Sequence, residues 1–181
     1  MAELMGKFLK YILLSFFIIG VFSLIFGYFL SNPIHPKLNL SPKFFVIFLT
    51  NLDIHVRSII YSFLSFGMYS FYFVFIHFFV VGISIGGIAT STNSLLSSLS
   101  FFWIHGIFEL ATVILTASIF PFFSLSITFL ILKKEINKKA LLKLLKIIFW
   151  VICMAFLLIL LSAVLETFVA PRYVKLDNKI T

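Results

Sequence analysis

Several polar and ionisable residues lie inside stretches that are otherwise apolar enough for a lipid bilayer. In residues 101–120, FFWIHGIFELATVILTASIF, His105 and Glu109 are four positions apart. Residues at this spacing share one face of a helix, so the imidazole and the carboxyl group can hydrogen-bond. Because an ionised side chain in hydrocarbon costs at least about 2.5 kcal/mol on insertion scales, such groups face the bundle interior and find partners. Each residue therefore makes the other tolerable.

Two further segments bring similar groups. Residues 51–57, NLDIHVR, carry an amide, a carboxylate, an imidazole and a guanidinium, and Glu166 stands near the end of the last apolar block. Arg57 can pair with Asp53, four positions earlier, or reach a carboxylate on another helix. With the topology derived below, all these groups share the outer half of the membrane. We expect one functional polar cluster, comprising Asn51, Asp53, Arg57, His105, Glu109 and Glu166.

Such a cluster suits several kinds of chemistry. His105, Glu109 and Glu166 have the side chains of a zinc site, and an open position on a divalent metal would activate water. Against this, the chain has no HExxH pair. A proton or ion relay is disfavoured, because the inner half of the bundle is expected to hold nothing polar. A pocket that docks or handles a peptide is the remaining function, and polar packing between helices is the structural alternative.

The composition indicates that a membrane protein carries these residues. Of 181 residues, 62% are hydrophobic and 11% are charged, with a mean hydropathy of +1.19. At about 20 residues a span, the chain has room for roughly four to six spans and no sizeable soluble domain. The net charge of +8 is concentrated at the ends of apolar segments, six lysines lying in KKEINKKALLKLLK. Such runs set orientation and touch anionic lipid headgroups, so nucleic acid is not an expected partner.

We expect an all-α polytopic membrane helix bundle that forms one integral membrane domain over residues 1–181. The apolar block 44–89 is too long for one crossing and has a weak point at SFGMYS. Positive charge should place both the N-terminus and the lysine run on the cytoplasmic side, which requires four crossings between them. The N-terminus is then inside and the C-terminus outside. The five expected spans are about 8–30, 44–65, 69–89, 101–132 and 147–168.

Local patterns add finer expectations. TSTNSLLSSLS reads as a polar interfacial loop, and Pro121 should kink the fourth span, part of which is long enough to be re-entrant or interfacial. In NKKALLKLLKII, lysines at helical spacing oppose leucines, which predicts a segment along the inner leaflet. The glycines of GISIGG favour close approach of another helix. His77 reads as a packing histidine.

The motifs resemble one known family. HGIFELATVIL, followed some fifty residues on by AVLETFVAP, resembles the paired signature of the stage II sporulation protein M family. IFLTNLDIHVRSIIYSFLSFG is similar to the asparagine-containing helix of that family, and VAPR is a loose form of its terminal motif. The resemblance covers about residues 40–171. Carried over position by position, it marks Asn51, His105, Gly106, Glu109, Glu166 and Pro171.

The resemblance implies a setting for the cluster. The sporulation protein belongs to an envelope-remodelling complex with peptidoglycan-degrading partners, whereas shorter members resemble those of circular-bacteriocin gene clusters. This short, basic chain is more similar to the second group. We therefore expect a multi-pass component of a bacterial cytoplasmic membrane that assists maturation, secretion or immunity of a hydrophobic peptide, or an envelope complex.

Partners follow from that expectation. They are membrane lipid, the hydrophobic peptide, and partner membrane proteins in an oligomer or multi-subunit complex. Two alternatives stay open beside this function. One is an intramembrane metal-dependent peptidase or peptide ligase that uses a divalent metal such as zinc, and the other is a scaffold in which the cluster only packs helices.

Overall fold

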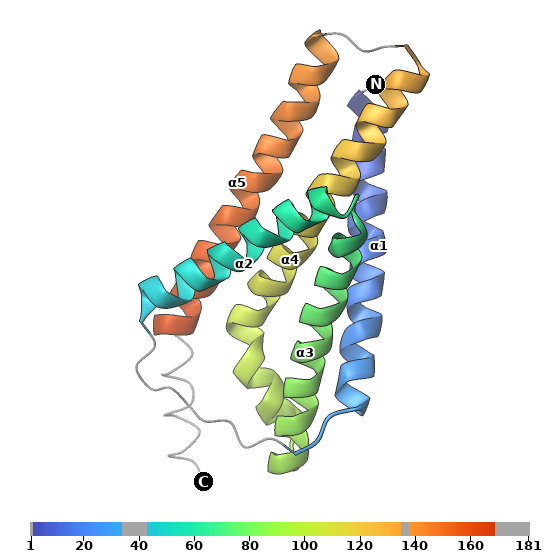
Figure 1. Cartoon of the computed structure of the whole chain (residues 1–181). Coiled ribbons are helices and arrows are strands. Elements are labelled where there is room, and N and C mark those ends of the chain that lie inside the picture. The colour runs from blue at the N-terminus through green and yellow to red at the C-terminus, as the bar shows by residue number, and fades with distance from the viewer. Residues whose placement is uncertain (1, 34–42, 135–137, 169–181) are drawn as a thin grey trace.

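A computed structural model describes residues 2–33, 43–134 and 138–168 of the chain. Within these ranges it contains five α-helices and no strand (Figure 1). Each helix is long and apolar enough to cross a membrane, which confirms the expected all-α membrane architecture. The helices are α1 (Ala2–Phe29), α2 (Phe44–Leu64), α3 (Met68–Thr92), α4 (Leu95–Leu132) and α5 (Lys138–Phe168).

The helices are arranged around α4. Helices α1 and α3 lie side by side, α4 packs against both, and α5 packs against α4 on its other side (Figure 1). Helix α2 differs from the rest because it crosses over α4 and α5, and it lies more across than along the axis of α1 and α3. The start of α1, the end of α4 and the start of α5 lie at the same end of the molecule, as an even number of crossings between them requires.

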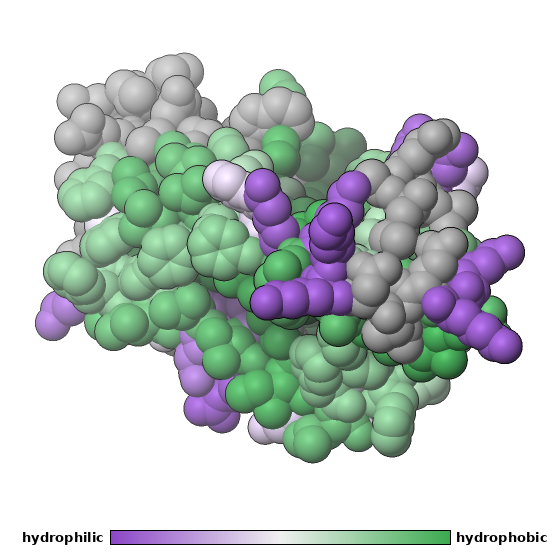
Figure 2. Space-filling model, turned by 90° about the horizontal axis from the view of Figure 1, so that it is seen from above, coloured by the Kyte–Doolittle hydropathy of each residue, from purple (hydrophilic) through white to green (hydrophobic). Residues whose placement is uncertain are grey.

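That end of the molecule is basic. Lys133 and Lys134 follow α4, and lysines occupy the first turns of α5. Seen from this end, hydrophilic side chains project from a body that is otherwise apolar (Figure 2). The placement of this end on the cytoplasmic side stays a prediction from charge.

Glycines allow α1 and α3 to meet at backbone distance. A Cβ on Gly82 would overlap the carbonyl oxygen of Leu24 in α1, and a Cβ on Gly27 would overlap that of Phe79 in α3. A Cβ on Gly86 would overlap the hydroxyl of a serine that follows α1. The structure therefore confirms the close helix approach expected at Gly82 and Gly86, and α1 is the helix that approaches.

Two apolar clusters hold the remaining contacts. The first joins α1, α3 and α4, and the second joins the start of α1 to the end of α4 and the start of α5. Phenylalanines supply much of the first, which buries its aromatic rings almost completely. The buried members are Phe16, Phe73, Val74, Phe78, Val113 and Ala117 in the first cluster, and Met5, Phe122, Leu130, Ala140 and Leu144 in the second.

The polar stretch 90–100 is mostly helical, so the expected interfacial loop is wrong. Helix α3 runs to Thr92 and α4 begins at Leu95, and Asn93 makes the turn with a left-handed backbone (φ 51°). Asparagine tolerates this conformation better than most residues. The hydroxyls of Thr90, Ser91, Thr92 and Ser98 bond to carbonyls of their own helix, as Thr90 does to Gly86 at 2.8 Å. The polar side chains of this stretch are therefore compatible with a helix, because they form hydrogen bonds within it.

The last two helices also differ from expectation. Helix α4 continues through Pro121 as one element, so no part of residues 101–132 forms a separate re-entrant segment. The lysine-rich segment expected along the inner leaflet is instead the beginning of α5. Its Ala140 and Leu144, one turn apart, are buried against the second apolar cluster, and this packing fixes the segment as an extension of the last span.

Candidate functional site

The inner face of α2 is polar. His55 is 5% exposed, and its Nδ1 lies 3.0 Å from Oγ1 of Thr116 in α4. Ser58 and Ser62, three and seven positions after His55, are buried on the same face. Ser62 also accepts a hydrogen bond from Ser70 of α3 at 2.9 Å. These contacts tie α2 to both α3 and α4 through hydrogen bonds inside the apolar bundle.

Asp53 and Arg57 lie on the opposite face of α2. Arg57 Nε donates to Asp53 Oδ1 at 2.9 Å and lies 2.8 Å from Oδ2, and the two side chains are 62% and 54% exposed. Two residues along a helix correspond to about 200° of rotation, so Asp53 cannot face the same way as His55. The structure therefore places this pair on the outside, whereas Asn51, one turn before His55, is half-buried on the inner side.

The structure brings Glu109 and Glu166 together. Glu109 lies three residues after Gly106, where the apolar span of α4 begins, and Glu166 is in the last turn of α5. Both side chains are half-buried, and the carboxyl group of Glu109 lies within electrostatic range of that of Glu166. The start of α2 closes over this end of α5, where the rings of Phe44 and Phe168 stack with centroids 6.5 Å apart.

A cavity between α3 and α4 is lined in part by Glu109. It has a volume of about 280 Å³, and Glu109 and His77 are its polar members. Its remaining lining is aliphatic and consists of Ile76, Val80, Val81, Leu110 and Val113. Sequence reasoning assigned His77 to packing because it stands alone in an apolar run, and no pattern in the sequence pointed to the cavity.

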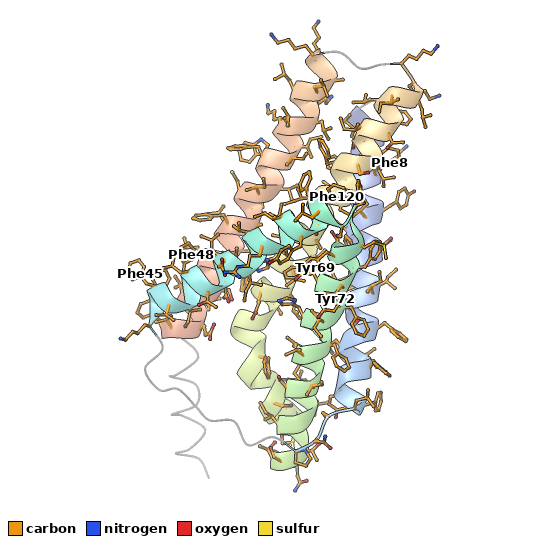
Figure 3. All side chains as sticks on the ribbon, viewed as in Figure 1. Phe8, Phe45, Phe48, Tyr69, Tyr72 and Phe120 are labelled. Carbon is orange, nitrogen blue, oxygen red and sulfur yellow. The ribbon has the colours of Figure 1, made fainter. Side chains whose placement is uncertain are left out.

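The hydrogen bond of His77 defines how it faces the cavity. Its Nδ1 lies 2.9 Å from the carbonyl oxygen of Phe73. A carbonyl oxygen can only accept, so Nδ1 carries the hydrogen, and Nε2 of the neutral ring is an acceptor. Phe73 also packs between this ring and that of His55, with centroids 4.2 and 5.6 Å away. Figure 3 shows Tyr69 and Tyr72 on the same part of α3, near the end of α2.

The described part of the structure does not include the side chain of His105 or any of Pro171. The expected hydrogen bond between His105 and Glu109 therefore stays a prediction. Among the described residues, no group of three or more His, Cys, Asp or Glu side chains could hold a metal ion. The metal site expected from His105, Glu109 and Glu166 needs the undescribed imidazole and likewise stays a prediction.

The described arrangement has a definite chemical character. The carboxyl group of Glu109 and the imidazole of His77 line an apolar cavity, and the carboxyl group of Glu166 lies within electrostatic range of Glu109. All three accept hydrogen bonds or attract positive charge, and Arg57, which could neutralise them, is engaged with Asp53 on the outside. The site therefore suits a ligand that is apolar and carries N–H donors or a cationic group.

Comparison with known proteins identifies the family. The family model described as stage II sporulation protein M matches residues 11–171. No curated protein and no solved structure matches the chain. The matched stretch spans four of the five helices entirely and most of α1, and it includes both carboxyl groups and the cavity between α3 and α4. The chain belongs to the stage II sporulation protein M family.

Proposed function

We propose that this family member is a multi-pass component of a bacterial cytoplasmic membrane that handles a hydrophobic peptide during its maturation, secretion or immunity. The peptide occupies the cavity between α3 and α4. The observation that carries the proposal is that an apolar cavity of about 280 Å³ has acceptors from Glu109 and His77 in its wall.

The size and lining of the cavity support a peptide ligand. An apolar cavity of about 150 Å³ binds benzene, so a space nearly twice as large takes one or two apolar side chains. The cavity is partly open at the surface of the bundle, which lets a peptide in the membrane insert side chains from the lipid. Aliphatic walls favour apolar residues without selecting one shape.

The polar groups support the same ligand. A peptide in hydrocarbon has no water to bond its free N–H groups, and each unsatisfied group costs several kcal/mol. The carboxylate of Glu109 and Nε2 of His77 can accept such hydrogen bonds. A cationic group on the peptide would in addition relieve the repulsion between Glu109 and Glu166.

The experiment measures peptide yield and self-protection in the producing cell. Val81→Phe fills the cavity, and Glu109→Gln removes its charge while keeping its shape. We expect either change to lower the amount of mature peptide in the culture medium, or survival on exposure to it, by about tenfold or more. Val21→Phe makes the same enlargement on the exterior of α1, and Glu109→Asp keeps the carboxylate. Both controls should stay near wild type.

The outcomes separate this function from its rivals. Unchanged yield and survival in both test variants, with the proteins present in the membrane at normal levels, would contradict the proposal. Stoichiometric metal in the purified protein, lost in His105→Ala, would replace peptide docking with metal chemistry. Recruitment of partner proteins that survives Glu109→Gln, while yield is also unaffected, would leave a scaffold.

A further inference from the structure

The outer face of α2 carries an ion pair on an otherwise apolar surface. Helix α2 is the least buried candidate span, with 11% of its most apolar stretch buried against 22 to 44% in the other four. The pair of Asp53 and Arg57 lies at the middle of this face and is more than half exposed. We use "outer face of α2" for the exposed residues Val46, Leu49, Asp53, Val56, Arg57, Ile60 and Leu64.

An ion pair in this position needs further partners. Charged side chains in a membrane segment face a bundle interior or a cavity and bind polar groups there, since hydrocarbon offers none. Arg57 contacts Asp53 through Nε, so both of its terminal amino groups remain available within the described part of the chain. Both side chains are more than half exposed, so these four N–H donors and the carboxylate are accessible from outside the bundle.

The orientation of α2 makes this face complementary to itself. Two copies inserted alike in one membrane are related by a two-fold axis along the membrane normal. For a helix parallel to that axis, the rotation would bring Asp53 against Asp53. Helix α2 lies more across than along the bundle (Figure 1), so the rotation reverses most of its direction and brings Asp53 of one copy nearer to Arg57 of the other.

We propose that a second copy of this chain docks on the outer face of α2, with Asp53 of each copy bound to Arg57 of the other. Four charges with no net charge then form one closed network, in which the terminal amino groups of each guanidinium reach the partner carboxylate. The aliphatic residues of the face surround this network and exclude lipid from it. Val56, between the two charges in sequence, lies next to the two-fold axis. The proposal is independent of the peptide cavity, which opens between α3 and α4.

Cysteine cross-linking in native membranes tests the contact. In a Cys153→Ala background, Val56→Cys introduces one thiol next to the proposed axis, and Val21→Cys introduces a matched thiol on the exterior of α1. After mild oxidation, Val56→Cys should give a disulfide-linked dimer in far larger amount than Val21→Cys, which reports random collision. Equal cross-linking of the two would overturn the proposal.

Charge exchange tests the network. In the Val56→Cys chain, Asp53→Arg or Arg57→Asp alone places like charges across the axis and should lower the cross-linked fraction by about tenfold or more. Co-expression of the two variants with different tags should restore a mixed dimer. The double variant Asp53→Arg/Arg57→Asp keeps the pair within each chain, guards against loss of folding, and should cross-link like its parent. Unchanged cross-linking in the single variants, or no recovery on mixing, would overturn the network.

Discussion

Gly82→Ala provides the sharpest test of the helix packing. The added carbon would overlap the carbonyl oxygen of Leu24, and the next nearest atoms, the carbonyl carbon of Leu24 and the amide nitrogen of Tyr28, would be 2.9 and 3.0 Å away. All three belong to the backbone of α1, which cannot rotate aside as a side chain does. The two helices must therefore separate.

The size of the effect follows from that separation. A gap of about 0.5 to 1 Å forfeits a quarter to a half of the dispersion energy of each contact across an interface. Overpacking of this kind costs typically 1 to 3 kcal/mol, about 1 kcal/mol of which is offset because alanine is the better helix former. Since α3 is the helix that α1 contacts most, we expect a net loss in the upper half of the resulting range, so that Gly82→Ala lowers the free energy of unfolding by about 1 to 2 kcal/mol.

Gly6→Ala is the matched control. Gly6 is an exposed glycine of α1, and a Cβ there would meet no atom within 4 Å. This change should be neutral or should stabilise the protein by up to about 1 kcal/mol. Unfolding of both variants is followed in mixed detergent and SDS micelles by tryptophan fluorescence. Equal stability of Gly82→Ala and Gly6→Ala would refute the reasoning that α1 and α3 touch through their backbones.

Gly27→Ala extends the test to coupling. Gly27 of α1 faces the backbone of Phe79 in α3, so an alanine at this position would push apart the same two helices as Gly82→Ala does. Once one alanine has moved them apart, the second finds part of its space already open. The double variant should therefore lose less than the sum of the two single losses, by about 0.5 kcal/mol or more. Strict additivity would indicate that the two glycines do not share an interface.

The remaining predictions concern a turn, a hydrogen bond and the carboxyl pair. Gly67→Ala should lower the free energy of unfolding by about 1 to 2 kcal/mol, because Gly67 has φ +90°, as measured by the same SDS titration. Thr116→Val should cost about 1 to 3 kcal/mol, since it leaves the buried imidazole of His55 without its partner, and a loss no larger than that of Thr116→Ser would contradict this. Glu166→Gln should leave stability within about 0.5 kcal/mol of wild type or raise it, because the amide keeps the shape and removes repulsion with Glu109; a clear loss in the titration would show that the charge is needed for folding.

The sequence was sufficient for those features that depend on local pattern. Apolar length and the separation of basic ends predict five helices, and small residues at Gly82 and Gly86 predict a close helix neighbour. Sequence could not identify α1 as that neighbour, because Gly20 and Gly27 mark a face of the first span but do not say which helix lies against it. It also could not place His77 at a cavity, since a cavity depends on the space left between two helices and not on one pattern.

The two faces of α2 show where a better reading of the sequence was available. Grouping Asp53 and Arg57 with the inner cluster followed from their depth along the helix and ignored rotation about it. His55, Ser58 and Ser62 recur at three and four positions, which marks one buried polar face, and the charged pair falls on the other. The rotational pattern thus separates two kinds of polar group on one helix.

The polar groups on the two faces of α2 need different partners. On the inner side, His55 has a partner in Thr116, and this bond holds a weakly buried helix to α4. On the outer side, each charge of the Asp53 and Arg57 pair has only the other within the described chain, in a segment apolar enough to lie in lipid. A helix that served only to pack this bundle would need the first set and would be less costly to insert with leucine in place of the second. The presence of a guanidinium and a carboxylate on the outer face is therefore best explained by a contact that the single chain does not make, and the lateral course of α2 allows that contact to be with its own copy.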